Sequence, residues 1–502
     1  MRPGLLFADT ADESEVPDTR PAHRLVEQVA EDLGLSEVID AMADGDREVA
    51  DAARTVLLAV PPHPVHVIHR QSVLADCMRE PNLARELYEL TGRALEARRS
   101  AARAVFFDTP ETMLNQSAVT LTSFVQLLRE LRLLVGRYRQ RVSSAGFGQL
   151  VAMVDDQFDD AYLQSAADQV SRLRLRGDIL VSARLGSGNQ SEGFVIRQPS
   201  RQARSLFRRG GRSDPPSASY RITGGDEAGH RALSSLRDQA VAGLAGAAVQ
   251  CAQHVLSFFA SLRAEVAFYL GCVNLRRALA DRGAPVCLPK VNEAASRLFT
   301  AQGLYDPGLQ LRLDHPAVAN DIDADGMSLI MVTGANRGGK STFLRSVGLA
   351  QLMAAAGIFV AATAFTTSAR TGVFTHFTSD EDTSLTSGKL DEELLRMSQI
   401  ADVITPNGML LCNESFQSTN EREGSGIARH VINAMTEAHV AVVFVTHLYE
   451  LANSCHEDRF GFPALFLRAE RDDAGHRSFR LHEAAPQATS YGADLWNRAQ
   501  RP

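Results

Sequence analysis

Apolar residues recur every three or four positions along the first part of the chain, which is the spacing of amphipathic helices. The pattern predicts a helical domain from the run at residues 22–104, which includes "HRLVEQVAEDLGLSEVIDAMA" and "LARELYELTGRALEARR". Two more helical blocks follow at 117–174 and 227–282. Both are longer than an average helix, so we expect extended helical arms.

The pattern changes between these two arms. The stretch "GDILVSARLGSGNQSEGFVIRQ" holds two short strand-forming runs around Gly, Ser and Asn, which predicts a β-hairpin. Residues 172–221 contain eleven arginines and three acidic residues, so this insertion is strongly basic. Such a cluster is typical of phosphate contacts, and equally of a solvated loop. On the first interpretation, the DNA-binding residues are Arg204, Arg208 and Arg209.

Beyond residue 311, strand patterns alternate with helical patterns, which predicts a mostly parallel sheet with ligands at the carboxyl ends of its strands. In "SLIMVTGANRGGKSTF" an apolar strand precedes GxxxxGKS and a helix, the order of a phosphate-binding P-loop. Its glycines let backbone N–H groups face phosphate oxygens, Lys340 neutralises the phosphates, and Ser341 ligates Mg²⁺. ATP and Mg²⁺ are therefore the expected ligands. The residues expected to bind the nucleotide in this loop are Gly334, Asn336, Gly338, Gly339, Lys340, Ser341 and Thr342.

Two later strands end in polar residues that suit the same site. The strand in "GMLLCNES" ends at Asn413 and Glu414, and the strand in "AVVFVTHLYEL" ends at His447. Glu414 is the candidate base for the attacking water, with Lys340 and His447 as further catalytic candidates. An isolated histidine is more often structural, but a strand end is where a γ-phosphate sensor lies. Asn413 is the second metal-side residue, and its amide brings no negative charge, so we expect weakened Mg²⁺ binding and slow hydrolysis.

Composition narrows the class of protein. The chain has 502 residues, 45% of them hydrophobic and 22% charged, as in a globular protein of several domains. Its six cysteines show no CxxC pair, which favours neither disulfides nor a zinc site. Neither a secretion signal nor an apolar run of membrane-spanning length is visible, so we expect a cytoplasmic, nucleoid-associated protein without membrane contact. A net charge of −8 leaves the arginine-rich insertion as the indication of nucleic-acid binding.

Three segments of the C-terminal part resemble the ATPase domain of the MutS family of DNA mismatch repair proteins. They are "TGANRGGKSTFLRSVGLAQLMAAAGIFVAA", "VTHLYEL" and "DHPAVAND", and the resemblance extends over residues 313–452. It is weaker upstream, where the paired arms and the basic insertion look like the family's core, lever and clamp. The resemblance implies a multidomain fold with an α-helical core and lever arms, a small β-rich clamp-like insertion, and a C-terminal α/β P-loop ATPase domain of ABC type. The implied regions are a tail (1–21), the core (22–116), an ascending lever (117–174), the clamp (175–225), a descending lever with connector (226–310) and the ATPase domain (311–502).

The chain also departs from the family pattern. It begins near the core region, so we expect no N-terminal mismatch-reading domain. Asn413 stands where the family usually has Asp, and the position of the aromatic residue that often stacks on adenine holds Ala317 or Val318.

The resemblance further implies a homodimer in which a signature loop of one chain completes the ATP site of the other. Here the candidate loop is "LTSGK", although Ser-Gly is equally typical of an exposed turn. The residues of this loop expected to face the nucleotide are Ser387, Gly388 and Lys389.

Together these observations favour a MutS-like ATPase of DNA repair that binds DNA and couples ATP binding and slow hydrolysis to the conformation of its clamp. Two alternatives remain. One is an ABC-type ATPase whose helical arms hold a protein partner, and the other is a nucleotide-binding regulator with little hydrolysis, which Asn413 allows. The arginine-rich insertion favours DNA, whereas salt-independent binding of a protein would favour the ABC-type alternative.

Overall fold

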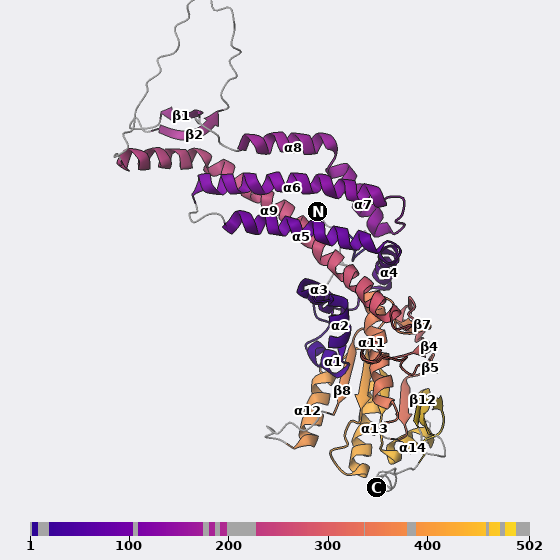
Figure 1. Cartoon of the computed structure of the whole chain (residues 1–502). Coiled ribbons are helices and arrows are strands. Elements are labelled where there is room, and N and C mark those ends of the chain that lie inside the picture. The colour runs from indigo at the N-terminus through magenta and orange to yellow at the C-terminus, as the bar shows by residue number, and fades with distance from the viewer. Residues whose placement is uncertain are drawn as a thin grey trace, which may run out of the picture. The chain divides into compact units, whose positions relative to one another are not determined.

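The structure is a computed structural model that describes residues 3–8, 20–103, 109–173, 180–185, 191–197, 227–335, 337–378, 388–457, 461–471 and 477–487 (Figure 1). The chain forms two compact units. The first comprises Met1–Pro3, Glu86–Arg139 and Val151–Arg263, and the second comprises Gly4–Arg85, Gln140–Leu150 and Ala264–Pro502. The expected multidomain organisation, mostly helical with additional sheets, is confirmed. The region boundaries expected from the sequence stay predictions.

The first unit is helical. Its elements, some of which extend into the second unit along the chain, are α5 (Pro81–Arg103), α6 (Pro110–Tyr138), α7 (Ala145–Gln157), α8 (Asp160–Leu173) and α9 (Glu227–Ala280). α6 begins at Pro110 because the Thr109 hydroxyl accepts a hydrogen bond from the N–H of Thr112. Asp159 caps α8 in the same way, through the N–H of Tyr162. The expected helical block at 117–174 is therefore three helices, α6 to α8. Ser144, whose hydroxyl accepts from the Phe147 N–H, precedes α7, and Asp159 precedes α8.

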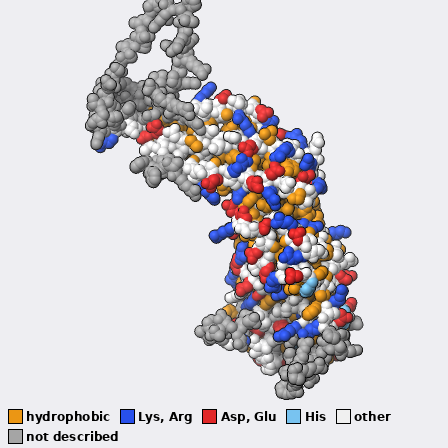
Figure 2. Space-filling view, viewed as in Figure 1, with side chains coloured by type: hydrophobic (Ala, Val, Ile, Leu, Met, Phe, Trp, Pro, Cys, Tyr) orange, Lys and Arg blue, Asp and Glu red, His pale blue; other side chains and the backbone are white. Residues whose placement is uncertain are grey.

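Apolar side chains form the core of this unit. Phe124 of α6 and Phe259 of α9 are both buried, with 5.9 Å between their ring centroids. Arg137 of α6 forms an ion pair of 2.6 Å with Glu86 of α5. Exposed ion pairs contribute only about 0–1 kcal/mol, so apolar burial stabilises the unit. On the face shown in Figure 2, Lys and Arg side chains are interspersed with Asp and Glu side chains over the described residues.

One stretch of α9, Asp238–Ala280, is long and apolar enough to cross a membrane by length and composition. Of its most apolar window, 56% is buried inside the protein, and Phe258, Phe259 and Leu262 are among its buried residues. A buried core helix has the same composition, so this stretch is only a weak indication of membrane contact.

Two strands of the basic insertion are described. β1 (Leu180–Leu185) and β2 (Ser191–Arg197) pair antiparallel, as the predicted hairpin requires. The candidate DNA-binding residues Arg204, Arg208 and Arg209 lie outside the described residues.

A six-stranded sheet forms the centre of the second unit. Its order is β12-β11-β6-β10-β9-β8, and every neighbouring pair is parallel except β11 with β12. The predicted mostly parallel sheet is therefore confirmed. β6 is buried at all five positions, as expected for a strand covered on both faces. The strands are β6 (Leu329–Thr333), β8 (Val373–Phe377), β9 (Met409–Asn413), β10 (Ala441–Val445), β11 (Ala464–Arg471) and β12 (Arg477–Glu483).

A smaller sheet has the order β3-β7-β4-β5, with β3 and β7 parallel and the other neighbours antiparallel. Its strands are β3 (Lys290–Asn292), β4 (Phe299–Leu304), β5 (Asn320–Asp323) and β7 (Ala364–Ser368). The helices that follow the P-loop strand are α11 (Lys340–Ala356), α12 (Lys389–Ala401), α13 (Glu421–Glu437) and α14 (Tyr449–Glu457), and α10 (Pro307–Arg312) precedes it.

Four N-terminal helices belong to the same unit as the six-stranded sheet. α3 and α4 contact α11, and α1 contacts β8. Hydrogen bonds support this packing: His23 Nε2 lies 2.9 Å from the Val373 carbonyl oxygen, and Arg70 donates to the carbonyl oxygen of Ala356 at 3.3 Å. These helices are α1 (Val26–Asp32), α2 (Leu35–Ala43), α3 (Arg47–Leu57) and α4 (Pro64–Arg79).

Candidate nucleotide-binding site

Strand order brings the predicted site residues together. β10 lies between β6 and β9, and Val445 of β10 is in register with Val332 on one side and Asn413 on the other. Because the three strands are parallel, their carboxyl ends meet at one edge of the sheet. The P-loop, Glu414 and His447 follow these ends directly.

The loop between β6 and α11 depends on its glycines. Gly334 and Gly339 have φ angles of 118° and 92°, which residues with a side chain rarely adopt. A Cβ on Gly338 would lie 2.8 Å from the Ala335 carbonyl oxygen, and a Cβ on Gly334 would lie 2.9 Å from the Ala469 nitrogen. The loop can therefore keep this tight turn only with glycine at these positions.

Lys340 lies inside this loop at the start of α11. Its Nζ donates to the carbonyl oxygens of Gly334 and Ala335, both at 3.1 Å, and lies 3.3 Å from His447 Nε2. Burial lowers the pKa of Lys340 to about 8, although Glu414 acts in the opposite direction. The side chain is thus a buried cation at a helix N-terminus, which suits a phosphate ligand.

Ser341 and Asn413, the two predicted metal-side residues, are in contact. The Ser341 hydroxyl donates to Asn413 Oδ1 at 2.9 Å. Both groups present oxygen, the ligand atom that Mg²⁺ prefers, so they fit this ion. Within the part of the chain that the structure describes, no group of three or more His, Cys, Asp or Glu is arranged to hold a metal. Mg²⁺ would therefore depend on these two oxygens together with phosphate oxygens and water.

Glu414 and His447 form the second close pair. His447 Nε2 donates to Glu414 Oε1 at 2.6 Å, and the N–H of Glu414 donates to the Val445 carbonyl oxygen at 2.9 Å. The hydrogen bond from His447 lowers the pKa of Glu414, burial raises it, and Lys340 lowers it further. The net shift is downward, so Glu414 is ionised and able to accept a proton from water. Its φ of 57° is unusual for a residue with a side chain and turns the chain sharply after β9.

A pocket of about 430 Å³ opens beside the P-loop. Gly338, Gly339, Lys340, Ser341 and Thr342 line it together with Glu414, and Ala317 and Val318 lie on its wall. Its volume falls within the range typical of small-molecule sites, about 300–1,000 Å³.

Phe479 of β12 also lines this pocket, and sequence reasoning missed it. The residue is 45% exposed, and its Cβ lies 3.3 Å from the position that a Cβ on Gly339 would take. Asn320 of β5 holds this part of β12 by accepting from the Leu481 N–H at 2.7 Å and donating to the Phe479 carbonyl oxygen at 3.4 Å. Phe479 is thus a partly exposed aromatic residue on the wall of this pocket, where positions 317 and 318 hold aliphatic residues.

Four of the predicted nucleotide contacts are not described at this pocket. Asn336 and Ser387 lie outside the described residues. Gly388 is exposed at the N-terminus of α12, where it is the N-cap residue, and Lys389 follows as the first residue of that helix. Neither lines the pocket of its own chain.

Two models of MutS-type domains match this chain, one of them over the region that contains the P-loop. The family model described as MutS2 N-terminal domain matches residues 63–282, and the model described as MutS domain V matches residues 330–502. The chain is 30% identical over 225 residues to DNA mismatch repair protein MutS of Thermus aquaticus, covering 42% of this chain and 26% of that protein.

Two further relatives show similar coverage. DNA mismatch repair protein MutS of Porphyromonas gingivalis is 33% identical over 147 residues, which is 28% of this chain and 16% of that protein. MutS protein homolog 4 of Mus musculus is 28% identical over 178 residues, which is 36% of this chain and 18% of that protein. The chain thus spans between 16% and 26% of the length of these curated relatives. With one MutS-type model matched on each side of residue 300, the chain belongs to the MutS family.

Proposed function

We propose that this chain is an ATPase that binds ATP with Mg²⁺ at its P-loop and couples ATP binding and slow hydrolysis to the way it holds DNA. The observation that carries the proposal is the meeting of Lys340, Glu414 and His447 beside the P-loop pocket, with 2.6 Å between His447 Nε2 and Glu414 Oε1. The names of the relatives, as DNA mismatch repair proteins, support the part concerning DNA.

Each residue has a chemical task in this proposal. Glu414 accepts a proton from the attacking water, whose oxygen bonds to the γ-phosphorus while the bond to the leaving oxygen of ADP breaks. His447 holds the Glu414 carboxylate in place by donating to it. The Lys340 ammonium offsets charge on the phosphate oxygens. Mg²⁺, held near Ser341 and Asn413, supplies further positive charge when it is bound.

Slow hydrolysis follows from the residue at position 413. Asn413 offers an amide oxygen and no charge, so Mg²⁺ is held less firmly. The same observation favours a second candidate, a nucleotide-binding regulator that hydrolyses little ATP. In both cases the nucleotide acts as a conformational switch.

The proposal also includes a dimeric assembly, DNA contacts and a location in the cell. The active unit is a homodimer in which the segment around Ser387 and Gly388 of one chain completes the ATP site of the other. Arg204, Arg208 and Arg209 contact DNA phosphates without reading the sequence. The protein acts in the cytoplasm, associated with the nucleoid.

Turnover of the full chain with and without DNA tests this function. We expect slow ATP hydrolysis that duplex, mismatched or branched DNA changes at low salt and changes less at high salt. Lys340→Ala should abolish turnover while the far-ultraviolet spectrum and unfolding midpoint stay unchanged. Equal turnover in the two proteins would exclude the ATPase. Normal turnover that no DNA alters at either salt concentration would leave the ATPase and exclude its coupling to DNA.

A further inference from the structure

A second cavity lies at the opposite edge of the six-stranded sheet from the P-loop. Its volume is about 80 Å³. Ser328 immediately precedes β6, Asn407 lies two residues before β9, and His439 lies two residues before β10, and all three line the cavity. These strands are parallel, so the cavity is at their amino ends and the nucleotide pocket at their carboxyl ends. The two sites are therefore separate.

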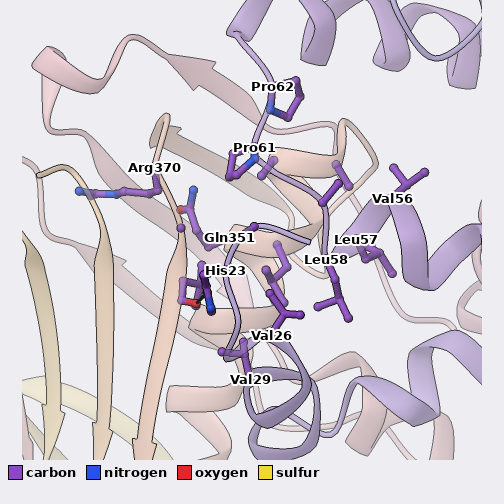
Figure 3. Close-up of a pocket in the computed structure, with 17 residues that line it drawn as sticks. His23, Val26, Val29, Val56, Leu57, Leu58, Pro61, Pro62, Gln351 and Arg370 are labelled. Atoms are coloured by element: carbon purple, nitrogen blue, oxygen red, sulfur yellow. Dashed lines mark hydrogen bonds between the residues drawn. The ribbon is translucent and has the colours of Figure 1, made fainter. Parts of the chain in front are cut away.

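Two arginines from the smaller sheet face the same cavity. Arg297 precedes β4 and Arg370 follows β7, and both line it. Figure 3 shows the stem of Arg370 beside a different cavity, near His23 and Pro61, with its guanidinium nitrogens pointing away from that cavity. Arg297 donates to the Ser328 hydroxyl. The cavity thus has two guanidinium groups on one side and polar strand ends on the other.

Arg370 has no compensating partner in the described part of the chain. Its Nε is buried without a hydrogen-bond partner, and no ion pair to Arg370 is found there. Burial lowers its pKa to about 10, and the neighbouring charge of Arg297 lowers it further. Arg370 is partly buried and Arg297 is exposed, and a partly buried cation beside a second cation is unfavourable unless an anion joins them. This electrostatic arrangement favours an anionic ligand.

Backbone conformation marks the same cavity. Eight described residues other than glycine have positive φ angles. Three of them line this cavity, namely Arg297 (48°), Asn407 (66°) and His439 (60°). Asn and His adopt this region more readily than most residues, but three such positions around one small cavity hold its wall in an uncommon shape. Three others line the nucleotide pocket: Arg337, Glu414 and Phe479.

We propose that this cavity binds a small tetrahedral oxyanion, either inorganic phosphate or the terminal phosphate monoester of a larger molecule, between Arg297 and Arg370. The amide of Asn407 and the imidazole of His439 supply further N–H donors at its wall. A cavity of about 80 Å³ is much smaller than the nucleotide pocket of about 430 Å³, so a base and sugar would remain outside. This site is independent of the proposed ATPase.

Phosphate-dependent thermal unfolding of the full chain tests the site. The experiment uses Lys340→Ala protein, so that the P-loop contributes little, and replaces chloride by inorganic phosphate at constant ionic strength. The unfolding midpoint should rise by a few degrees with saturation, as expected for a ligand that binds only the folded state. Adding Arg370→Met to this background should remove the rise. Because Arg370→Met takes away a partly buried charge without an ion-pair partner among the described residues, the variant should fold.

Two controls make the outcome specific. Arg297→Met should also remove the phosphate response, whereas Arg277→Met should keep it, since Arg277 is an exposed residue paired with Asp44. Absence of a phosphate response in Lys340→Ala protein, or a response that survives both Arg370→Met and Arg297→Met, would overturn the proposal.

A further arm separates the two sources of the anion. Short oligonucleotides with and without a 5′-phosphate replace inorganic phosphate in the same experiment. A rise that requires both the 5′-phosphate and Arg370 identifies a terminal phosphate as a ligand. A rise with inorganic phosphate alone identifies a solute site. Equal rises with both oligonucleotides, unaffected by Arg370→Met, count against the cavity as the binding site.

Discussion

Asn413 presents an amide oxygen to the Ser341 hydroxyl at 2.9 Å, at a position where the MutS family usually has an Asp. Asn413→Asp adds a negative charge beside the proposed Mg²⁺ site and keeps an oxygen for Ser341. We expect the Mg²⁺ concentration for half-maximal turnover to fall roughly tenfold, the lower end of the effect of residues around a metal. Asn413→Ala, which removes the oxygen, should raise it. Identical Mg²⁺ titrations for all three proteins would place residue 413 away from the metal.

Phe479 gives a second test at the scale of one residue. Stacking of a base on an aromatic ring contributes about 1–3 kcal/mol, as measured by alanine substitution. Phe479→Ala should therefore weaken ATP binding by about that amount, and Phe479→Tyr should restore it. Tripolyphosphate, which has no base, should bind the wild type and Phe479→Ala equally in calorimetry. A matching loss for tripolyphosphate would show that the substitution disturbs the P-loop through Gly339 and that the ring does not contact the base.

Asn413 could be predicted as a site residue from the sequence, whereas Phe479 could not. The P-loop is local: strand, glycines, Lys340 and helix are adjacent in the chain, so spacing alone predicts their meeting. Asn413, Glu414 and His447 follow from the rule that parallel strands present their carboxyl ends together. Phe479 comes from β12, whose place depends on pairing with β11 and on Asn320. No local pattern marks such a contact.

Among the elements, α12 is tied to the loop that carries Glu414. His376 of β8 has both ring nitrogens engaged in the core: Nε2 donates to the Glu393 carbonyl oxygen of α12 at 2.9 Å, and Nδ1 accepts from the Ser415 hydroxyl at 2.6 Å. Ser418 adds a hydrogen bond of 2.9 Å to the Glu393 side chain. Ser415 follows Glu414 directly in the chain. A displacement of α12 would therefore change the position of Glu414, the candidate base.

This arrangement predicts a pH dependence of stability. Burial lowers the pKa of His376 from 6.5 to about 4, so the folded chain binds a proton less readily than the unfolded chain. The resulting loss of stability begins as the pH falls below the unfolded pKa and reaches its full size below the folded one. Between pH 7 and 5 this amounts to about 2 kcal/mol. His376→Gln keeps a donor and an acceptor but does not titrate.

Urea unfolding at pH 7 and pH 5 provides the measurement. The variant should lose about 2 kcal/mol less stability than the wild type over this interval. Phe416 stacks on His376 at 5.2 Å and is uncharged, so Phe416→Leu serves as a control for altered packing with the titration intact. Parallel losses in the wild type and His376→Gln would mean that other groups cause the acid sensitivity.

The spacing of apolar residues predicts helices but does not predict where each helix begins and ends. Helical spacing identified the arms, but the caps at Ser144 and Asp159 divide the chain into α6, α7 and α8 in a way that apolar spacing does not reveal. Helical periodicity also does not predict which elements pack against each other. That α1 contacts β8, more than 300 residues later in the chain, depends on surfaces that exist only after both elements have formed.

At the scale of the whole molecule, the pocket of one chain supplies only part of the proposed ATP site. In the proposed ATP site, Lys340, Glu414 and His447 contact the phosphates from the P-loop side. Hydrolysis also gains from donors aimed at the γ-phosphate from the other side. Gly388 is exposed and does not line this pocket, which suits a segment that acts on a second chain. We therefore expect shared sites in a two-fold symmetric dimer.

Complementation between two inactive variants tests this expectation. Lys340→Ala disables the P-loop and Ser387→Arg the opposing segment, so each protein alone should lack turnover. In a mixed dimer, one site combines the intact P-loop of the Ser387→Arg chain with the intact segment of the Lys340→Ala chain. Mixing should therefore restore part of the wild-type rate. Lys340→Ala mixed with Glu414→Gln is the matched control, because these two residues act in the same chain and no site in that mixture is whole. If mass measurement shows mixed dimers and both mixtures stay inactive, the segment around Ser387 does not complete the site of the second chain.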